Sequence, residues 1–240
     1  MIIPIFEYTA YPLFVFSILF SMWAQFRISS SFNKYSRLMT HAGINASDFA
    51  RTMLLNAGVT DVTIGRVGGN LTDHFNPVNK VLALSDTTYA SHSAAAIGVA
   101  AHEAGHAIQH AEGYFPIKLR RILVPITSVA SRMSWIFITV GIIITASVQA
   151  FEFGYYILLA GVGLFAVTTL FQLVTLPCEF NASRRAMAAM ENSGYYSDEE
   201  LSAAKKVLFA AALTYVAATL ASAIQLLRLL LILGRNKKRR

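Results

Sequence analysis

The chain has 240 residues, of which 55% are hydrophobic and only 14% are charged, and its mean hydropathy is +0.51. Soluble domains carry about 25% charged residues, so this composition predicts a membrane protein, while six prolines and one cysteine exclude a disordered chain or a disulfide scaffold. Part of the net charge of +7 lies in the terminal run 235–240, which we expect to meet the anionic headgroups of a lipid bilayer rather than nucleic acid.

The first apolar run covers residues 8–26 and predicts an N-terminal transmembrane anchor over residues 1–26. A signal peptide is disfavoured because a basic start and an A-x-A cleavage site are both missing. Residues 27–132 then form a polar segment. Within it we expect a short helix over 47–56 capped by Ser47, a strand over 61–67, a turn at 68–70, a strand over 81–85, and a helix from Ser93 to Ala111 closed by Gly113.

Two further apolar runs, 133–151 and 153–177, are joined by a short connection around Glu152 and predict a transmembrane hairpin over residues 133–177. A second polar segment follows over 178–206. The last region, 207–240, contains an apolar run that is interrupted by Arg228 and ends in the basic tail. These runs predict a mainly helical, multi-pass membrane protein with three to four transmembrane helices and a small β-sheet.

Basic residues gather at one end of each of the first three apolar runs: Arg27, Lys34, Arg37, Lys118, Arg120, Arg121, Arg132, Arg184 and Arg185. Because basic residues near span ends favour the cytoplasmic side, both polar segments are expected in the cytoplasm. A fully spanning fourth helix would place the basic tail outside, against the same rule. Either that helix packs on the polar domain or lies along the interface, or the rule is broken once.

The expected helix over 93–111 contains two histidines, His102 and His106, four residues apart. Residues at this spacing lie one turn above each other, so both imidazoles can reach one metal ion. Glu103 follows the first histidine and can act as general base toward a water molecule. Two histidines and a glutamate on a helix with buried, small neighbours would be costly without a partner, so the pattern predicts a single catalytic zinc.

Catalytic zinc usually has three protein ligands, so a third ligand is needed. His110 is the nearest candidate, but Gln109 and Glu112 stand where a metzincin has its glycine and third histidine, and His110 is better explained as a residue near the helix end. Glu179 lies where the third span should re-enter the interface. From the residues alone, Glu179 could equally well be a metal ligand or a solvated glutamate.

The arrangement HEAGHAIQH, then two spans, then EFNASRRA resembles the YugP-type membrane zinc metallopeptidases, which are related to HtpX-like and CAAX prenyl endopeptidases in the gluzincin group. Segments 71–77 and 211–217 extend the resemblance over most of the chain. It implies that His102, His106 and Glu179 bind zinc and that Glu103 is catalytic. It further implies a helical zinc-metalloprotease domain at the cell membrane that hydrolyses membrane or membrane-proximal proteins.

One residue departs from this family pattern. Gluzincins of this group commonly have an aspartate four residues after the ligand glutamate, where it orients a ligand histidine, but this chain has Ser183. Either Ser183 or Asn181 could accept an imidazole N–H, although neither supplies a negative charge. Candidates for stabilising the oxyanion, which the sequence does not rank, are His74, Arg184, Tyr195, Tyr196 and Tyr215.

Several alternatives stay open. The strand over 81–85 could be a sheet edge that pairs with an extended substrate or an ordinary core strand. Cys178 could ligate the metal, but a buried apolar cysteine is the more common case. At the level of function, the rivals are a non-catalytic zinc-binding scaffold, which would need a fourth protein ligand, and an intramembrane site-2-type protease, which would carry its motif inside a span. Substrate specificity and oligomeric state lie beyond the sequence.

Overall fold

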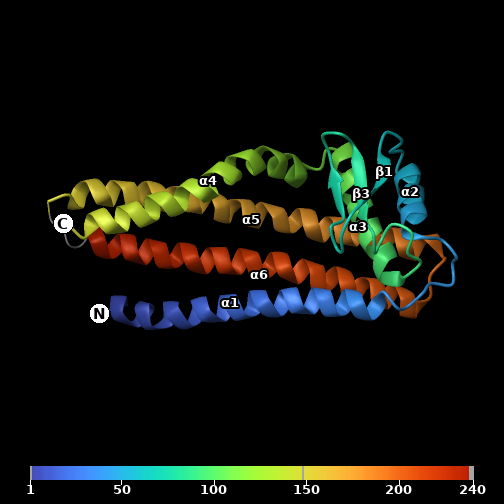
Figure 1. Ribbon diagram of the computed structural model, residues 1–240, viewed down its shortest axis with the longest axis horizontal. Helices are drawn as coiled ribbons and strands as arrows, with labels where there is room; N and C mark the ends of the chain where they lie inside the picture. The colour runs from blue at the N-terminus through green and yellow to red at the C-terminus, as the bar shows by residue number, and fades with distance from the viewer. Residues whose placement is uncertain (1, 148, 238–240) are drawn as a thin grey trace. The chain divides into compact units, whose positions relative to one another are not determined.

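The computed structural model describes residues 2–147 and 149–237, with side chains for 11–147 and 149–234. This part of the chain forms six helices and three strands (Figure 1), in the order α1 (Ile2–Tyr35), α2 (Ala46–Asn56), β1 (Thr63–Val67), β2 (His74–Asn76), β3 (Val81–Ser85), α3 (Ala94–Ala111), α4 (Phe115–Thr145), α5 (Phe151–Ser193) and α6 (Asp198–Lys237). Four of these helices, α1, α4, α5 and α6, are long and apolar enough to cross a membrane. The predicted mainly helical, multi-pass architecture with a small sheet is confirmed. The side chains of the basic run 235–240 lie outside the described residues.

The chain divides into two compact units. The first unit comprises residues up to Met22, Leu119–Thr175, and Tyr215 onward, whereas the second comprises Trp23–Lys118 and Leu176–Thr214. The division falls inside each of the four long helices, so each of them contributes residues to both units. These helices also extend well beyond the apolar runs, and α5 continues without a break through Pro177.

In the first unit, α4 and α5 form a closely packed hairpin. A Cβ atom added at Gly141 would lie 2.5 Å from the backbone nitrogen of Leu158, and one at Gly161 would lie 2.7 Å from that of Ile138. Only glycine allows backbones to approach this closely. The closeness of the two helices explains why the connection between them is short.

The C-terminal half of α6 packs against this hairpin within the first unit. Leu229 and Leu233 are buried in one apolar cluster with residues from α4 and α5, namely Ile138, Tyr155, Leu158, Val162 and Phe165. The guanidinium of Arg228, which interrupts the apolar run, lies 4.0 Å from the ring centroid of Phe14 in α1 and 5.3 Å from that of Tyr11. The arginine is thereby accommodated by cation–π contacts, and the fourth apolar run belongs with the other three.

The second unit begins with the end of α1 and then α2, whose start differs from the prediction. Asn45, and not Ser47, is the N-cap, because its Oδ1 accepts hydrogen bonds from the backbone N–H of Asp48 at 2.9 Å and from Ser47 Oγ at 2.8 Å. Ser47 lies in the first turn and is buried. Both residue types cap helices well. The helix lies where the sequence predicts it, but it begins one residue earlier.

The sheet has the order β1-β3-β2, with β3 parallel to β1 and antiparallel to β2. The strand over 81–85 has the predicted bounds, but it is the central strand of the three and therefore not an edge available to substrate. Strand β2, which the sequence analysis missed because it has only three residues, lies at one edge. Asp73 fixes the end of β3, since it accepts hydrogen bonds from the backbone N–H of Ser85 at 2.8 Å and from its hydroxyl at 2.9 Å.

Helix α3 ends at Ala111 as predicted and begins at Ala94, one residue after the predicted start, with Ser93 as its N-cap. It ends before Gly113, whose φ of +66° is favourable for glycine. Its small residues pack against α2 and the sheet, so Ile97, Ala100 and Ala104 share a fully buried core with Leu82 and Leu84 of β3. Figure 1 shows α3 beside β3 and α2. This packing holds the two histidines of α3 in place.

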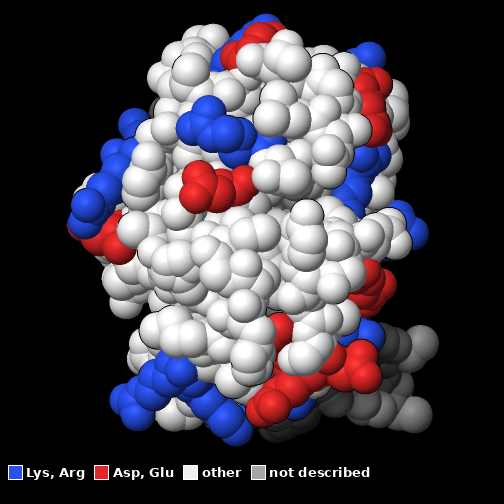
Figure 2. Space-filling view, turned by 90° about the vertical axis from the view of Figure 1, so that its right-hand side faces the viewer, with Lys and Arg blue, Asp and Glu red and all other residues white. Residues whose placement is uncertain are grey.

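Charged side chains of both signs are interspersed on the face of the molecule in Figure 2 rather than gathered in one patch. In the second unit several of these charges are paired. Arg66 donates to Asp86 at 2.6 Å, and Lys80 pairs with Asp61. The backbone N–H of Gly69 and the Arg66 guanidinium together hold the pKa of Asp86 below its usual value. The contacts of Asp86 connect the turn at 68–70 to the end of β3.

Gly105 allows α3 and α5 to touch, and its replacement by alanine should separate them. A Cβ atom there would lie 2.9 Å from the carbonyl oxygen and 3.2 Å from the Cα of Ala182. We expect Gly105→Ala to destabilise the protein by about 1–3 kcal/mol, measured as a lower Tm in detergent. The matched change Gly163→Ala, where nothing lies within 4 Å, should leave the Tm nearly unchanged. Equal effects of the two changes would contradict the prediction.

Candidate metal centre

Three side chains from α3 and α5 meet in the second unit. One ligand atom from each of His102, His106 and Glu179 lies within 4.8 Å of the others. The Oε2 atom of Glu179 is 3.2 Å from Nε2 of His102 and 3.4 Å from Nε2 of His106. The two imidazole centroids are 4.7 Å apart, as expected for residues one helical turn apart. Glu179 is 1% exposed, so this carboxylate is buried among the imidazoles.

The donor set fits a metal ion of the zinc type. Two imidazole nitrogens and one carboxylate oxygen are the ligands of a common class of catalytic zinc site, which leaves a fourth position for water. Within the described residues the group has three members, and neither Cys178 nor His110 is among them. Cys178 is buried, and the ring of His110 packs against that of Phe75 at 5.5 Å.

The second nitrogen of each imidazole also has a partner. Nδ1 of His102 lies 3.0 Å from the hydroxyl of Ser183. Nδ1 of His106 lies 3.0 Å from Oε1 of Gln109. Asn181 is hydrogen-bonded to Gln109 and Arg185. In the sequence, Gln109 is noted only because it stands where a metzincin has its glycine. Its spacing of three residues from His106 nevertheless places it on the same helix face.

Glu103 follows His102 on α3 and is half-buried. Burial raises the pKa of its carboxyl group above the usual value, while the nearby His106 and His102 act in the opposite direction, and Glu179 and Asp73 raise it further. A carboxyl group with a raised pKa takes up and releases protons closer to neutral pH. The environment of Glu103 is therefore suited to proton transfer.

The candidates for oxyanion stabilisation lie in different places. Tyr196 is a core residue, because its buried ring packs edge-on against Phe49 with centroids 5.4 Å apart. His74 is exposed on β2, where its Nδ1 lies 2.9 Å from the carbonyl oxygen of Thr72. Tyr195 and Arg184 are exposed. Tyr215 belongs to the first unit, and its role stays a prediction.

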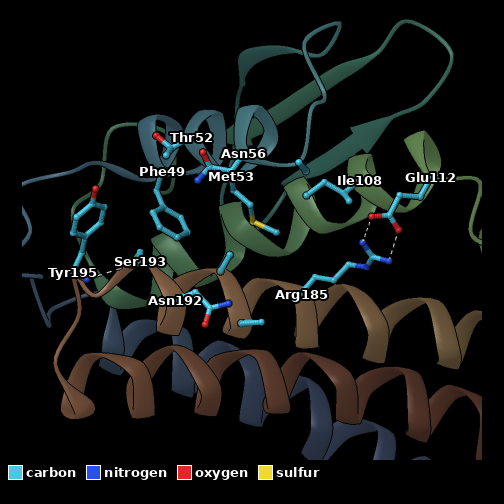
Figure 3. A pocket seen from close by; sticks show the side chains of 13 residues that line it. Phe49, Thr52, Met53, Asn56, Ile108, Glu112, Arg185, Asn192, Ser193 and Tyr195 are labelled. Atoms are coloured by element: carbon cyan, nitrogen blue, oxygen red, sulfur yellow. Dashed lines mark hydrogen bonds and ion pairs between the residues drawn. The ribbon is translucent and has the colours of Figure 1, made fainter.

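A groove of about 560 Å³ lies between α2, the end of α3 and the last turns of α5 (Figure 3). Phe49, Met53 and Ile108 give it an apolar lining, and Arg185 and Glu112 face each other at one end, joined by two hydrogen bonds. None of the three donor residues lines this groove. Arg185 nevertheless connects it to Asn181, and so to the surroundings of His106.

Comparisons with known proteins agree with this chemistry. Residues 10–234 match a family model described as "Putative neutral zinc metallopeptidase". The chain is 40% identical over 212 residues to a Bacillus subtilis (strain 168) protein named "Putative membrane protease YugP", and the alignment covers 88% of this chain and 91% of that relative. No solved structure matches the chain.

Proposed function

Because the chain belongs to the "Putative neutral zinc metallopeptidase" family, we propose that it is a membrane-bound zinc metalloendopeptidase that hydrolyses peptide bonds of membrane or membrane-proximal proteins. The observation that carries this proposal is the meeting of His102, His106 and Glu179 beside Glu103. The family and the name of the relative support peptidase activity in general. The endopeptidase activity and the class of substrate are inferred from the site and from the apolar helices that carry it.

Zinc held by His102, His106 and Glu179 would supply Lewis acidity, polarising the scissile carbonyl and lowering the pKa of a water molecule to about 7. The carboxylate of Glu103 takes a proton from the attacking water as the new carbon–oxygen bond forms. It then gives this proton to the amide nitrogen as the carbon–nitrogen bond breaks. The raised pKa of Glu103 supports the first transfer, since a stronger base accepts the proton more readily.

We place the zinc centre on the cytoplasmic side of the cell membrane. The basic residues near the ends of the first three apolar runs support this side. The packing of α6 on the α4–α5 hairpin supports four spans, with both chain ends on the opposite side. The basic tail then breaks the positive-inside rule once and meets headgroups of the outer leaflet. Of the options left open by the sequence, this one agrees best with the position of α6.

Two rival functions are less well supported. A closed structural zinc site would need a fourth protein ligand, and the group has three members in the part of the chain that the structure describes. An intramembrane protease would carry its motif within a span, but α3 has 18 residues, packs against a sheet, and is not among the four helices that could cross a membrane.

The proposal is tested by removing and restoring the metal. We expect the protein purified in detergent to contain about one zinc per chain and to cleave an unstructured membrane-protein substrate. Dialysis against a zinc chelator should abolish cleavage, and addition of Zn²⁺ should restore it. A chain that binds no divalent metal, or that cleaves equally well after metal removal, would refute the proposed function.

A further inference from the structure

Gln109 is a buried, uncharged residue whose polar atoms are all engaged. It is 0% exposed. Its Nε2 atom donates to the carbonyl oxygen of Cys178 at 2.8 Å and to Oδ1 of Asn181 at 2.9 Å, and its Oε1 lies 3.0 Å from Nδ1 of His106. Because burying an amide without partners is costly, this set of contacts determines how the side chain can be oriented.

The direction of each hydrogen bond follows from groups that can act only as donors or only as acceptors. The guanidinium of Arg185 only donates, so the Asn181 atom at 2.8 Å from its Nε must be the oxygen. The carbonyl of Cys178 only accepts. A Gln109 atom that meets two acceptors is the amide nitrogen, with both hydrogens used. The amide oxygen therefore faces His106, where it can only accept a hydrogen bond from Nδ1–H.

This acceptor determines the tautomer of His106. A neutral imidazole has one protonated nitrogen and one with a lone pair, so an N–H at Nδ1 leaves the lone pair on Nε2. That is the nitrogen 3.4 Å from Oε2 of Glu179. The tautomer imposed by Gln109 is thus the one in which Nε2 can bind a metal together with Glu179.

An ion pair holds the outer end of this network. Arg185 Nη1 and Nη2 donate to the two carboxylate oxygens of Glu112 at 2.9 and 2.6 Å, as drawn in Figure 3. Glu112 is the C-cap residue of α3. The hydrogen-bonded network therefore connects Glu112 at the end of α3 to Arg185 and Asn181 of α5, and these to Gln109 of α3. Bidentate hydrogen bonds of this kind restrict the guanidinium to one orientation.

We propose that Gln109 is a positioning residue that fixes the tautomer and orientation of His106, and that Asn181 and Arg185 hold Gln109 in the required orientation. The inference rests on the proposed function in that it concerns the same zinc site. It assigns to a neutral amide the task that a carboxylate performs in many metal sites. The hydroxyl of Ser183 lies 3.0 Å from Nδ1 of His102, so Nδ1 of each imidazole faces a neutral side chain.

The test measures zinc affinity and the Nδ1–H signal of His106 in the zinc-loaded, detergent-solubilised protein. We expect Gln109→Met, which removes the acceptor at similar volume, to weaken zinc binding by about 10–100-fold, measured by competition with a chelator. In ¹⁵N-histidine spectra the His106 Nδ1–H proton should lose its downfield position and its protection from exchange.

Three further variants make the result specific. Ser183→Ala should move only the other imidazole signal, which assigns the two resonances, and Gln172→Met, the same change at a half-buried glutamine of α5, should move neither. Asn181→Leu acts through Gln109, one hydrogen bond further from His106. It should shift the His106 signal even if Gln109→Met does not fold. Unchanged zinc affinity and an unchanged signal in Gln109→Met, or in Asn181→Leu if the former is unfolded, would overturn the inference. Neither readout needs peptidase activity, so an inactive protein with the expected signals would refute the proposed function alone.

Discussion

Replacement of Glu103 by glutamine is expected to lower the rate of peptide cleavage by about 10²–10⁴-fold, the contribution typical of a positioned general base. The glutamine side chain keeps the shape of glutamate but cannot take a proton from water at neutral pH. Because Glu103 is not among the three donors, zinc content should stay at the wild-type level. The measurement is kcat on an unstructured membrane-protein substrate, together with zinc content from the same preparation.

A matched change separates this effect from a general loss of carboxylate charge. Glu191→Gln alters an exposed glutamate of α5 and should leave kcat within about twofold of wild type, as is usual for surface substitutions. Cleavage by Glu103→Gln at the wild-type rate would remove Glu103 from the mechanism. Loss of zinc in that variant would instead make Glu103 part of the metal site.

Replacement of Glu179 by alanine should have its largest effect on the metal itself. The change removes one of three donors and leaves His102 and His106 facing a cavity. We expect zinc affinity to fall by more than the 10–100-fold that loss of an outer partner costs. Cleavage should be lost at zinc concentrations that saturate the wild-type protein. Zinc affinity is measured by chelator competition, and thermal unfolding without metal shows whether the fold is retained.

Ser183→Ala provides the comparison for this result, because it removes a partner of His102 and no donor. Its zinc affinity should fall by about 10–100-fold, less than that of Glu179→Ala. Ser183→Asp should bind zinc at least as tightly as wild type, since it supplies a negative charge beside His102. Full zinc occupancy in Glu179→Ala, or a larger loss in Ser183→Ala, would contradict the assignment of Glu179 as the third donor.

Much of the fold could be predicted because its signals are local. The bounds of α3 follow from Ser93 and Gly113, the bounds of β3 from a short apolar strand, and the long helices from their hydropathy. The spacing of His102 and His106 similarly places both on one face of α3. These features depend on residues a few positions apart, and periodicity reports such relations directly.

The rest depends on contacts between distant segments. The end of the apolar run at Pro177 predicts a new segment after that residue, but α5 continues to Ser193, because neighbouring helices can compensate for one missing N–H. Strand β2 is too short to have a pattern and exists because it pairs with β3. The partnership of Gln109 with Asn181 and Cys178 joins residues 69 and 72 positions apart. No local pattern could have revealed it.

The unbroken course of α5 has a consequence for how the protein is made. Two candidate zinc donors lie on α3, and the third, Glu179, lies on α5, the second helix of the α4–α5 hairpin and one of the candidate spans. During synthesis the α3 histidines therefore emerge from the ribosome well before their carboxylate partner. A chain that stops before α5 holds only two of the three candidate donors, so on the proposed function it should lack peptidase activity.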